Sequence, residues 1–189
     1  MIRVPNIFSA VLGFSTVLAV GLVPLPSQAV DEGDLRRFLS TLDCPGCDLR
    51  GADLRRLDLS GANLQGANLE QANFYRAQLQ GANLRGANLS RTNLSYSSFQ
   101  SALLEMADLR DAILFAANFD NTLMDQADLR GAEIEETSFI GASMLQADLR
   151  QAFVVSTDFS QATLCGSLTT NGWEYRNDCT DGERLTFDE

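Results

Sequence analysis

The sequence predicts an all-β solenoid, in which short extended segments wind repeatedly around one hydrophobic core. Residues 47–166 divide into 24 consecutive pentads, and the central residue of each, from Leu49 to Leu164, is Leu, Phe, Met, Ile or Val. All eight glycines of this stretch lie two residues after a centre. A second period of 20 residues overlies the first, because the tetrapeptide Ala-Asp-Leu-Arg recurs at that interval. It stands at 107–110, 127–130 and 147–150.

A period of five fits neither an α-helix nor a straight strand. Residues five apart on a helix are rotated by about 140°, which would spread the apolar centres around the cylinder. On a straight strand an odd spacing puts successive centres on opposite faces. The chain must therefore turn once per pentad. Ala stands two residues before 17 of the 24 centres and can share the inner side with them, while Gly, Asn and Asp favour the turn.

The 20-residue period indicates four pentads per coil and hence six coils. Residues 20 apart then stack about 4.8 Å from each other, which gives a rod roughly 29 Å long. Four phenylalanines follow this spacing and are expected to form one column in the core: Phe99, Phe119, Phe139 and Phe159. Proline is absent from 47–166, as expected if the backbone N–H groups hydrogen-bond between coils.

This pattern resembles the pentapeptide-repeat proteins, whose signature is Ala-(Asp/Asn)-Leu followed by two variable residues. The resemblance implies a right-handed quadrilateral β-helix. The segment Leu39–Ala52 and the stretch from Leu164 to Cys179 further resemble exported members of the family that are common in cyanobacteria and plant thylakoids. The later coils depart from the signature where apolar residues replace Asn or Asp. These residues are Leu103, Ile113, Leu123 and Phe153.

Residues 1–29 are predicted to be a cleaved secretory signal peptide. Arg3 is their only charge, residues 7–23 form an apolar run, and Ser27-Gln28-Ala29 is a small-x-small cleavage site. A retained membrane anchor is the alternative, but the run is short for a span and two prolines follow it. We expect a mature chain without a stable membrane anchor, exported to the periplasm or the thylakoid lumen.

The segments on either side of the repeats are predicted to cap the solenoid. In residues 30–46, Leu35, Phe38, Leu39 and Leu42 follow the spacing of an amphipathic helix that ends before Pro45-Gly46. Such a cap covers the unpaired backbone edge of the first coil. Residues 167–189 lose the period. They carry a hairpin signal at Asn171-Gly172 and end in an acidic tail.

The four cysteines form two pairs near opposite ends of the rod, Cys44 with Cys47 and Cys165 with Cys179. A disulfide needs Cα atoms about 6 Å apart, so bridges between the two ends are excluded. The expected disulfides are therefore Cys44–Cys47 and Cys165–Cys179, although Cys47 could instead pack as a small apolar side chain. Four-cysteine zinc coordination is excluded by the same distance.

The composition argues against an enzyme. The chain has no histidine, which removes Ser-His-Asp, Cys-His and the usual zinc hydrolase sites, and no glycine-rich phosphate loop is present. No metal or cofactor is expected. Cys44-Pro-Gly-Cys47 leaves a thiol-redox protein as a third hypothesis, without the strand-then-helix setting that lowers a thiol pKa.

The charge is negative and uneven. All 14 basic residues are Arg, against 25 Asp and Glu. Residues 47–106 carry a net charge of +1 (six Arg, five acids), and residues 107–166 carry −7 (three Arg, ten acids). Such a surface does not favour nucleic acid or acidic lipid, and it suits cationic partners or divalent ions.

The outer positions are where a function could lie. A column of Asp108, Asp128 and Asp148 beside Arg110, Arg130 and Arg150 is interpreted as a self-neutralising ladder of charges. Two other sides carry outward apolar residues in the later coils, which suggests a surface for a partner. These residues are Leu103, Ile113, Phe115, Leu123, Leu145, Phe153 and Val155. The alternatives are that flanking side chains cover these residues or that the repeat has decayed.

The sequence therefore predicts a non-enzymatic structural or protein-interaction module of an oxidising compartment. A protein partner is expected, and a homodimer is one alternative. The second hypothesis is a DNA-mimicking inhibitor of a topoisomerase such as gyrase, because some pentapeptide-repeat proteins resemble duplex DNA in shape and charge. The acidic half favours that hypothesis, whereas the Arg residues beside the Asp column, the export signal and the disulfides count against it.

Overall fold

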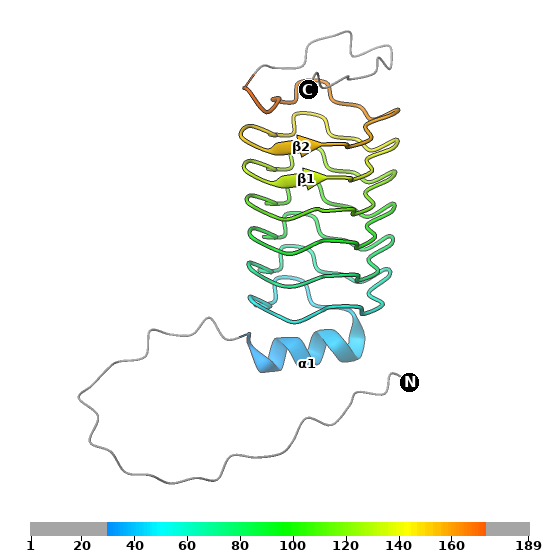
Figure 1. Ribbon diagram of the computed structural model, residues 1–189. Helices are drawn as coiled ribbons and strands as arrows, with labels where there is room; N and C mark the ends of the chain where they lie inside the picture. The colour runs from blue at the N-terminus through cyan, green and yellow to red at the C-terminus, as the bar shows by residue number, and fades with distance from the viewer. Residues whose placement is uncertain (1–29, 173–189) are drawn as a thin grey trace, which may run out of the picture.

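The computed structural model describes residues 30–172, which form a stack of coils with a helix across one end (Figure 1). The predicted signal peptide and its cleavage site, Cys179 and the acidic tail lie outside the described residues. The regular elements are α1 (Glu32–Thr41), β1 (Glu133–Glu135) and β2 (Phe153–Val155).

Helix α1 lies across the N-terminal end of the coils (Figure 1). The carboxylate of Asp31 caps it by accepting hydrogen bonds from the N–H groups of Gly33 and Asp34, at 2.8 and 2.9 Å. Leu42 caps the C-terminal end of the helix, where it adopts a left-handed conformation and donates its N–H to the Phe38 carbonyl. Phe38 is fully buried, but Leu39 is 40% exposed, contrary to the expected four-residue apolar stripe. The buried stripe of this short helix is narrower than the sequence pattern indicated.

The coils are joined by parallel backbone pairing between residues 20 apart. The pairing begins with Asp43 and Asn63 and continues to Asp148 and Leu168. It therefore extends a few residues beyond the predicted array of 47–166 at both ends. The reason is that backbone pairing needs only N–H and C=O groups in register, and Leu168 supplies these without matching the signature. Leu168, which precedes the predicted hairpin turn at Asn171-Gly172, pairs in parallel with the preceding coil.

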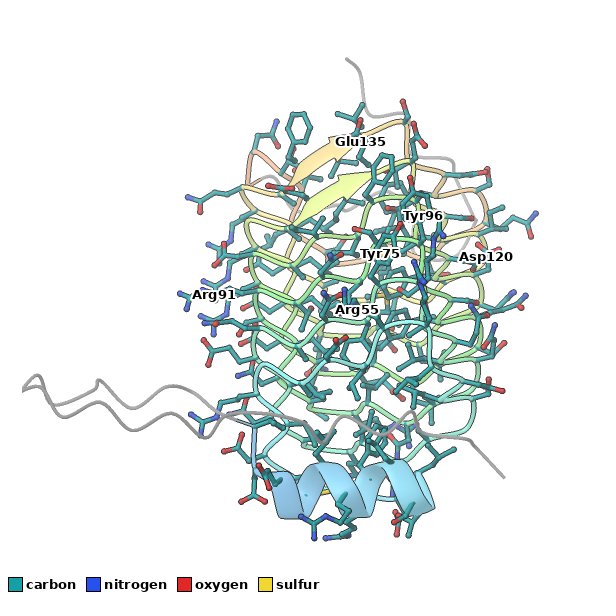
Figure 2. All side chains as sticks on the ribbon, turned by 60° about the horizontal axis from the view of Figure 1, so that its bottom comes forward. Arg55, Tyr75, Arg91, Tyr96, Asp120 and Glu135 are labelled. Carbon is teal, nitrogen blue, oxygen red and sulfur yellow. A yellow bond between two sulfur atoms is a disulfide. The ribbon has the colours of Figure 1, made fainter. Side chains whose placement is uncertain are left out.

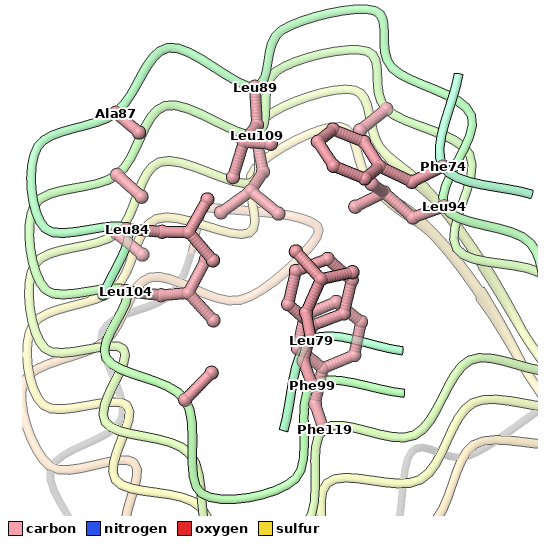
Figure 3. Packing of buried hydrophobic residues seen from close by; sticks show 14 of the residues in the cluster. Phe74, Leu79, Leu84, Ala87, Leu89, Leu94, Phe99, Leu104, Leu109 and Phe119 are labelled. Carbon is pink, nitrogen blue, oxygen red and sulfur yellow. The ribbon is translucent and has the colours of Figure 1, made fainter. Parts of the chain in front are cut away.

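Each coil has four sides, and each side contributes one column of centres to the core. Figure 3 shows these columns facing one another across the tube. They include Leu84 with Leu104, Leu89 with Leu109, Phe74 with Leu94, and Leu79 with Phe99 and Phe119. The rings of the column from Phe99 to Phe159 stack with centroids 4.7 to 5.2 Å apart, as expected. Nearly every centre is fully buried.

Hydroxyl residues that replace the inner Ala are also buried without an unpaired polar atom. Thr92 donates its hydroxyl to the Leu89 carbonyl over 2.6 Å, and Thr122 donates to the Phe119 carbonyl over 2.7 Å. Ser97 makes the same bond to Leu94. Each hydroxyl thus satisfies a carbonyl at the turn, which removes the cost of burying it.

The turn of every pentad is left-handed, whatever residue occupies it. All 24 residues two positions after a centre have positive φ, both in glycines such as Gly51 (65°) and in side-chain-bearing residues such as Arg56 (59°). This conformation costs an L-residue about 1–2 kcal/mol relative to glycine. Asn and Asp were expected at the turn, but they stand before it, in the position that immediately precedes the centre. Their side chains accept a hydrogen bond from the N–H two residues on, as Asn88 does from Ser90 over 3.0 Å.

Within the described range, the isolated backbone pairings between coils extend into regular strands only at β1 and β2. Glu133, Ile134 and Glu135 pair in parallel with Phe153, Val154 and Val155. Both segments lack the usual Asn or Asp before the centre, and β-branched residues favour the extended backbone.

A disulfide joins Cys44 and Cys47, whose Cα atoms are 5.4 Å apart. Both side chains are buried where α1 meets the first coil. Cys165 is also disulfide-bonded, and Cys179, its expected partner, lies outside the described residues.

The stacked phenylalanine column should be a main source of stability. Phe119 is fully buried between the rings of Phe99 and Phe139, so Phe119→Ala should lower the free energy of unfolding by roughly 3–5 kcal/mol in urea denaturation. Gln126→Ala, at an exposed turn, is the matched control and should change it by less than about 0.5 kcal/mol. Equal effects of the two substitutions would contradict the packing described.

Candidate interaction surfaces

The residues that flank each centre point outward and form four faces along the rod. We name three of them. The Asp–Arg face surrounds the centres Leu49, Leu69, Leu89, Leu109, Leu129 and Leu149. The aromatic face surrounds Leu54, Phe74, Leu94, Leu114, Ile134 and Val154. The leucine face, opposite the aromatic face, surrounds Leu64, Leu84, Leu104, Met124, Met144 and Leu164.

The Asp–Arg face neutralises its own charges. Arg110 binds Asp108 through two hydrogen bonds of 2.8 and 2.6 Å, and its Nε lies 3.8 Å from Asp128 in the next coil. Arg130 repeats this arrangement with Asp128 and, at 3.7 Å, with Asp148. The column is therefore a continuous alternation of carboxylates and guanidinium groups, in agreement with the interpretation of the sequence.

These contacts lower the pKa of the carboxyl groups in the column. Burial acts to raise the pKa of Asp108 and of Asp148, but it is outweighed. Hydrogen bonds from the side chain and backbone of the following Arg, together with the Arg charge, hold each pKa below its usual value. The same contacts raise the pKa of Arg110.

The aromatic face carries a cluster of three rings in edge-to-face contact, two of which, Tyr75 and Tyr96, are labelled in Figure 2. Tyr96 meets Tyr75 edge-on, with centroids 5.7 Å apart, and meets Phe115 edge-on at 5.3 Å. The guanidinium of Arg76 lies over both tyrosine rings, at 5.2 and 5.5 Å from their centroids. The cluster crosses three successive coils.

Exposed apolar side chains extend the aromatic face toward the C-terminal end. Phe153 is 61% exposed, and Ile113 and Val155 are also exposed. Phe115, included in the predicted partner surface, is half-buried because it packs against Tyr96. Tyr96, at 44% exposure, was missed from the sequence because it occupies the turn position usually taken by glycine.

The leucine face is the second apolar surface. Leu123 is exposed, whereas Leu103 and Leu145 are half-buried. Met106 also occupies the turn position that glycine often takes. It is 63% exposed, and the sequence analysis did not identify it as a surface residue. Between these residues Glu105 accepts two hydrogen bonds from Arg85 at one oxygen, over 2.9 and 2.6 Å. Its other oxygen, Oε2, is buried without a hydrogen-bond partner.

The cysteine cluster does not offer a metal site in its oxidised form. The Asp34 carboxylate lies within 4.8 Å of both Cys44 and Cys47 sulfurs. The sulfurs are joined to each other, and Asp34 accepts the Asp48 N–H over 2.9 Å. Their burial also keeps the disulfide away from a redox partner.

The family model described as pentapeptide repeats matches eight copies, at residues 42–71, 72–111, 92–131 and 112–151. The chain belongs to the pentapeptide-repeat family. Members of this family form right-handed quadrilateral β-helices, and they are generally non-enzymatic repeat proteins that act as protein-interaction modules.

Two solved pentapeptide-repeat structures resemble this one in fold. The first is the pentapeptide repeat protein Rfr23 from the cyanobacterium Cyanothece 51142. It is 23% identical, with a TM-score of 0.55, and the match covers 75% of this chain and 98% of that one. The second is a trypsin-treated variant of QnrB1, a plasmid-mediated fluoroquinolone resistance protein. It is 18% identical, with a TM-score of 0.53 and coverage of 67% and 70%. No curated protein matches the chain significantly in sequence.

Within residues 30–172, this pentapeptide-repeat protein has no helix long and apolar enough to cross a membrane.

The Asp–Arg column should make the stability of this pentapeptide-repeat protein sensitive to acid. Because the folded-state pKa values of Asp108 and Asp148 are lowered, their contribution is present above the unfolded pKa of about 3.9 and is lost as the pH falls through the folded values. Asp108→Asn with Asp148→Asn should therefore lose less stability between about pH 4 and pH 2 than the parent chain.

Urea unfolding at several pH values measures this difference. Gln126→Ala, which removes no titrating group, is the control and should leave the pH profile parallel to that of the parent. Parallel pH profiles for the double variant and the parent would contradict a stabilising role of the column.

Proposed function

We propose that this chain is a rigid protein-interaction module that binds a protein partner through its outward apolar faces. The observation that carries the proposal is the exposure of large apolar side chains on two opposite faces, foremost Met106 and Phe153. They stand where the repeat otherwise carries glycine, Asn or Asp. Contiguous exposed apolar groups of this kind typically mark protein-binding surfaces.

The buried oxygen of Glu105 supports the leucine face as one binding surface. Burying a carboxylate oxygen without a hydrogen-bond donor lowers the free energy of unfolding. A partner that places a backbone N–H or hydroxyl group beside Leu103 and Leu123 would satisfy it while covering the apolar side chains. The pair of exposed Arg85 and largely buried Glu105 then fixes the orientation of that partner.

The rod supplies rigidity to this module. We propose that the pairing of residues 43–168 makes about six coils. The apolar signal segment, the buried Cys44–Cys47 disulfide and the predicted Cys165–Cys179 disulfide support an oxidising compartment, the periplasm or the thylakoid lumen.

Affinity capture from an envelope or lumen extract tests the module. Met106→Ser with Leu123→Ser should reduce capture through the leucine face, and Ile113→Ser with Phe153→Ser should reduce it through the aromatic face. Both pairs should lower the free energy of unfolding by less than about 1 kcal/mol, because the residues are exposed.

Gln146→Ser with Gln151→Ser, at exposed turns, is the matched control for capture. Phe115→Ser, suggested by the sequence, is unsuitable because it also breaks the contact with Tyr96. The proposal would be contradicted if all variants captured the same partners, or if the serine substitutions greatly lowered the free energy of unfolding.

Inhibition of a topoisomerase is a second candidate, favoured by the net charge of −7 over residues 107–166. The Asp–Arg face argues against it, since each of its carboxylates in that half is neutralised by an adjacent guanidinium and does not imitate a free phosphate. We expect no inhibition in a gyrase supercoiling assay with the mature chain. Inhibition that is lost on reversing the charges of Glu133 and Glu135 would favour the DNA-mimic function instead.

A further inference from the structure

The aromatic face holds almost all of the unpaired charge of the described chain. Within residues 30–172, every carboxylate has a cation or a hydrogen-bond donor except Glu133, Glu135 and Glu136. Among the arginines of the same range, only Arg37, Arg56 and Arg76 lack a carboxylate, and the last two lie on the aromatic face. One face therefore presents free positive charge toward α1 and free negative charge toward β2.

Arg56 and Glu136 are symmetrically placed about Tyr96, whereas Arg76 stands opposite the uncharged Ala116. Arg56, Tyr96 and Glu136 occupy the same left-handed turn, with φ of 59°, 60° and 53°, and they follow one another at 40 residues, which is two coils. The neighbouring column places Arg55 and Glu135 at equal distances from the same level. It also places Tyr75 and Phe115 one coil to either side. Figure 2 shows Arg55, Tyr75, Tyr96 and Glu135 following one another along this face.

We propose that the aromatic face binds a second copy of this chain as an antiparallel dimer with its two-fold axis at the level of Tyr96. The axis runs along the extended segments, so each column of one copy meets the same column of the other in reverse order. Arg56 then faces Glu136 of the other copy, and Arg55, which is also paired with Asp53, faces Glu135. Asp53 faces Glu133 in the same way, so a level of net charge +1 meets a level of net charge −3. Tyr75 faces Phe115, and the two Tyr96 rings meet at the centre.

Charge selects this arrangement over a parallel one. A two-fold axis along the rod would bring equal levels together, so Glu133, Glu135 and Glu136 would face the same three residues of the other copy, and such like-charge contacts oppose association. A different partner would need a matching negative end, aromatic middle and positive end at the same spacing of four coils, roughly 19 Å. The same face of a second copy in the antiparallel orientation supplies the negative end, the aromatic middle and the positive end, which makes the interface isologous.

The dimer should be reversible and sensitive to salt. One face of the rod is narrow compared with the roughly 800 Å² per partner of a standard stable interface. The charges at its two ends are exposed, so added salt screens them, while the aromatic contacts at the centre persist. The inference rests on the proposed function, because it names the partner for one of the two faces.

Sedimentation equilibrium of the mature chain tests the proposal. The average mass should rise from monomer toward dimer with concentration and fall again with added NaCl. Arg56→Glu and Glu136→Arg should each weaken dimerisation by about tenfold or more, because each places like charges opposite one another. Arg91→Glu, which reverses a charge at the same kind of exposed turn on the Asp–Arg face, is the matched control and should leave dimerisation unchanged.

Recombining the two variants separates pairing from misfolding. In an antiparallel dimer, a mixture of the Arg56→Glu chain and the Glu136→Arg chain restores opposite charges at both ends. The mixture should therefore form heterodimers, although neither chain dimerises well alone. The double variant, which carries both substitutions in one chain, should also regain dimerisation. A misfolded variant would be rescued in neither experiment.

The outcomes distinguish this inference from the proposed function. A parent chain that stays monomeric up to about 1 mM, or a dimer that Arg56→Glu leaves unchanged, overturns the antiparallel dimer. If such a chain still captures a partner through its apolar faces, the proposed function stands without it. A dimer that behaves as expected while no other protein is captured supports the inference and removes the proposed second partner.

Discussion

The hydrogen bond from each pentad centre to the neighbouring coil is the interaction on which the structure depends. Leu109 donates its N–H to the Asp128 carbonyl over 2.7 Å, and Asp128 donates its own N–H to Ala107 over 2.9 Å. The same pattern recurs from one end of the stack to the other. It uses backbone groups alone, so it imposes a 20-residue register without dictating which side chains point outward.

Because the register is set by the backbone, each outward column can specialise. The Asp–Arg face uses its charges in internal pairs, whereas the aromatic face leaves Arg56 and Glu136 unpaired. The leucine face carries apolar groups around Glu105. A single scaffold thus presents a neutralised surface, a charged aromatic surface and an apolar surface at fixed spacing.

The core could be predicted from the sequence because its period reports directly which side chains point inward. Nearly every predicted centre is buried inside the tube, and Val154, in the last coil, is partly buried. The outer surface was predicted less well. Tyr96 and Met106 occupy a phase associated with glycine, so the pattern gave no reason to expect large exposed side chains there. Phe115 fits the pattern of an outward residue, but its exposure depends on a ring from another coil.

The stacking direction also has a mechanical consequence. The inter-coil hydrogen bonds run nearly parallel to the axis of the stack, so a force pulling its two ends apart loads the coils in series. The outermost coil should detach first, and each detachment frees 20 residues. At 3.3–3.6 Å per extended residue, less the height of a folded coil, every rupture lengthens the chain by roughly 65 Å. Under tension the rod should therefore unfold one coil at a time, with an equal increase in chain length at each rupture.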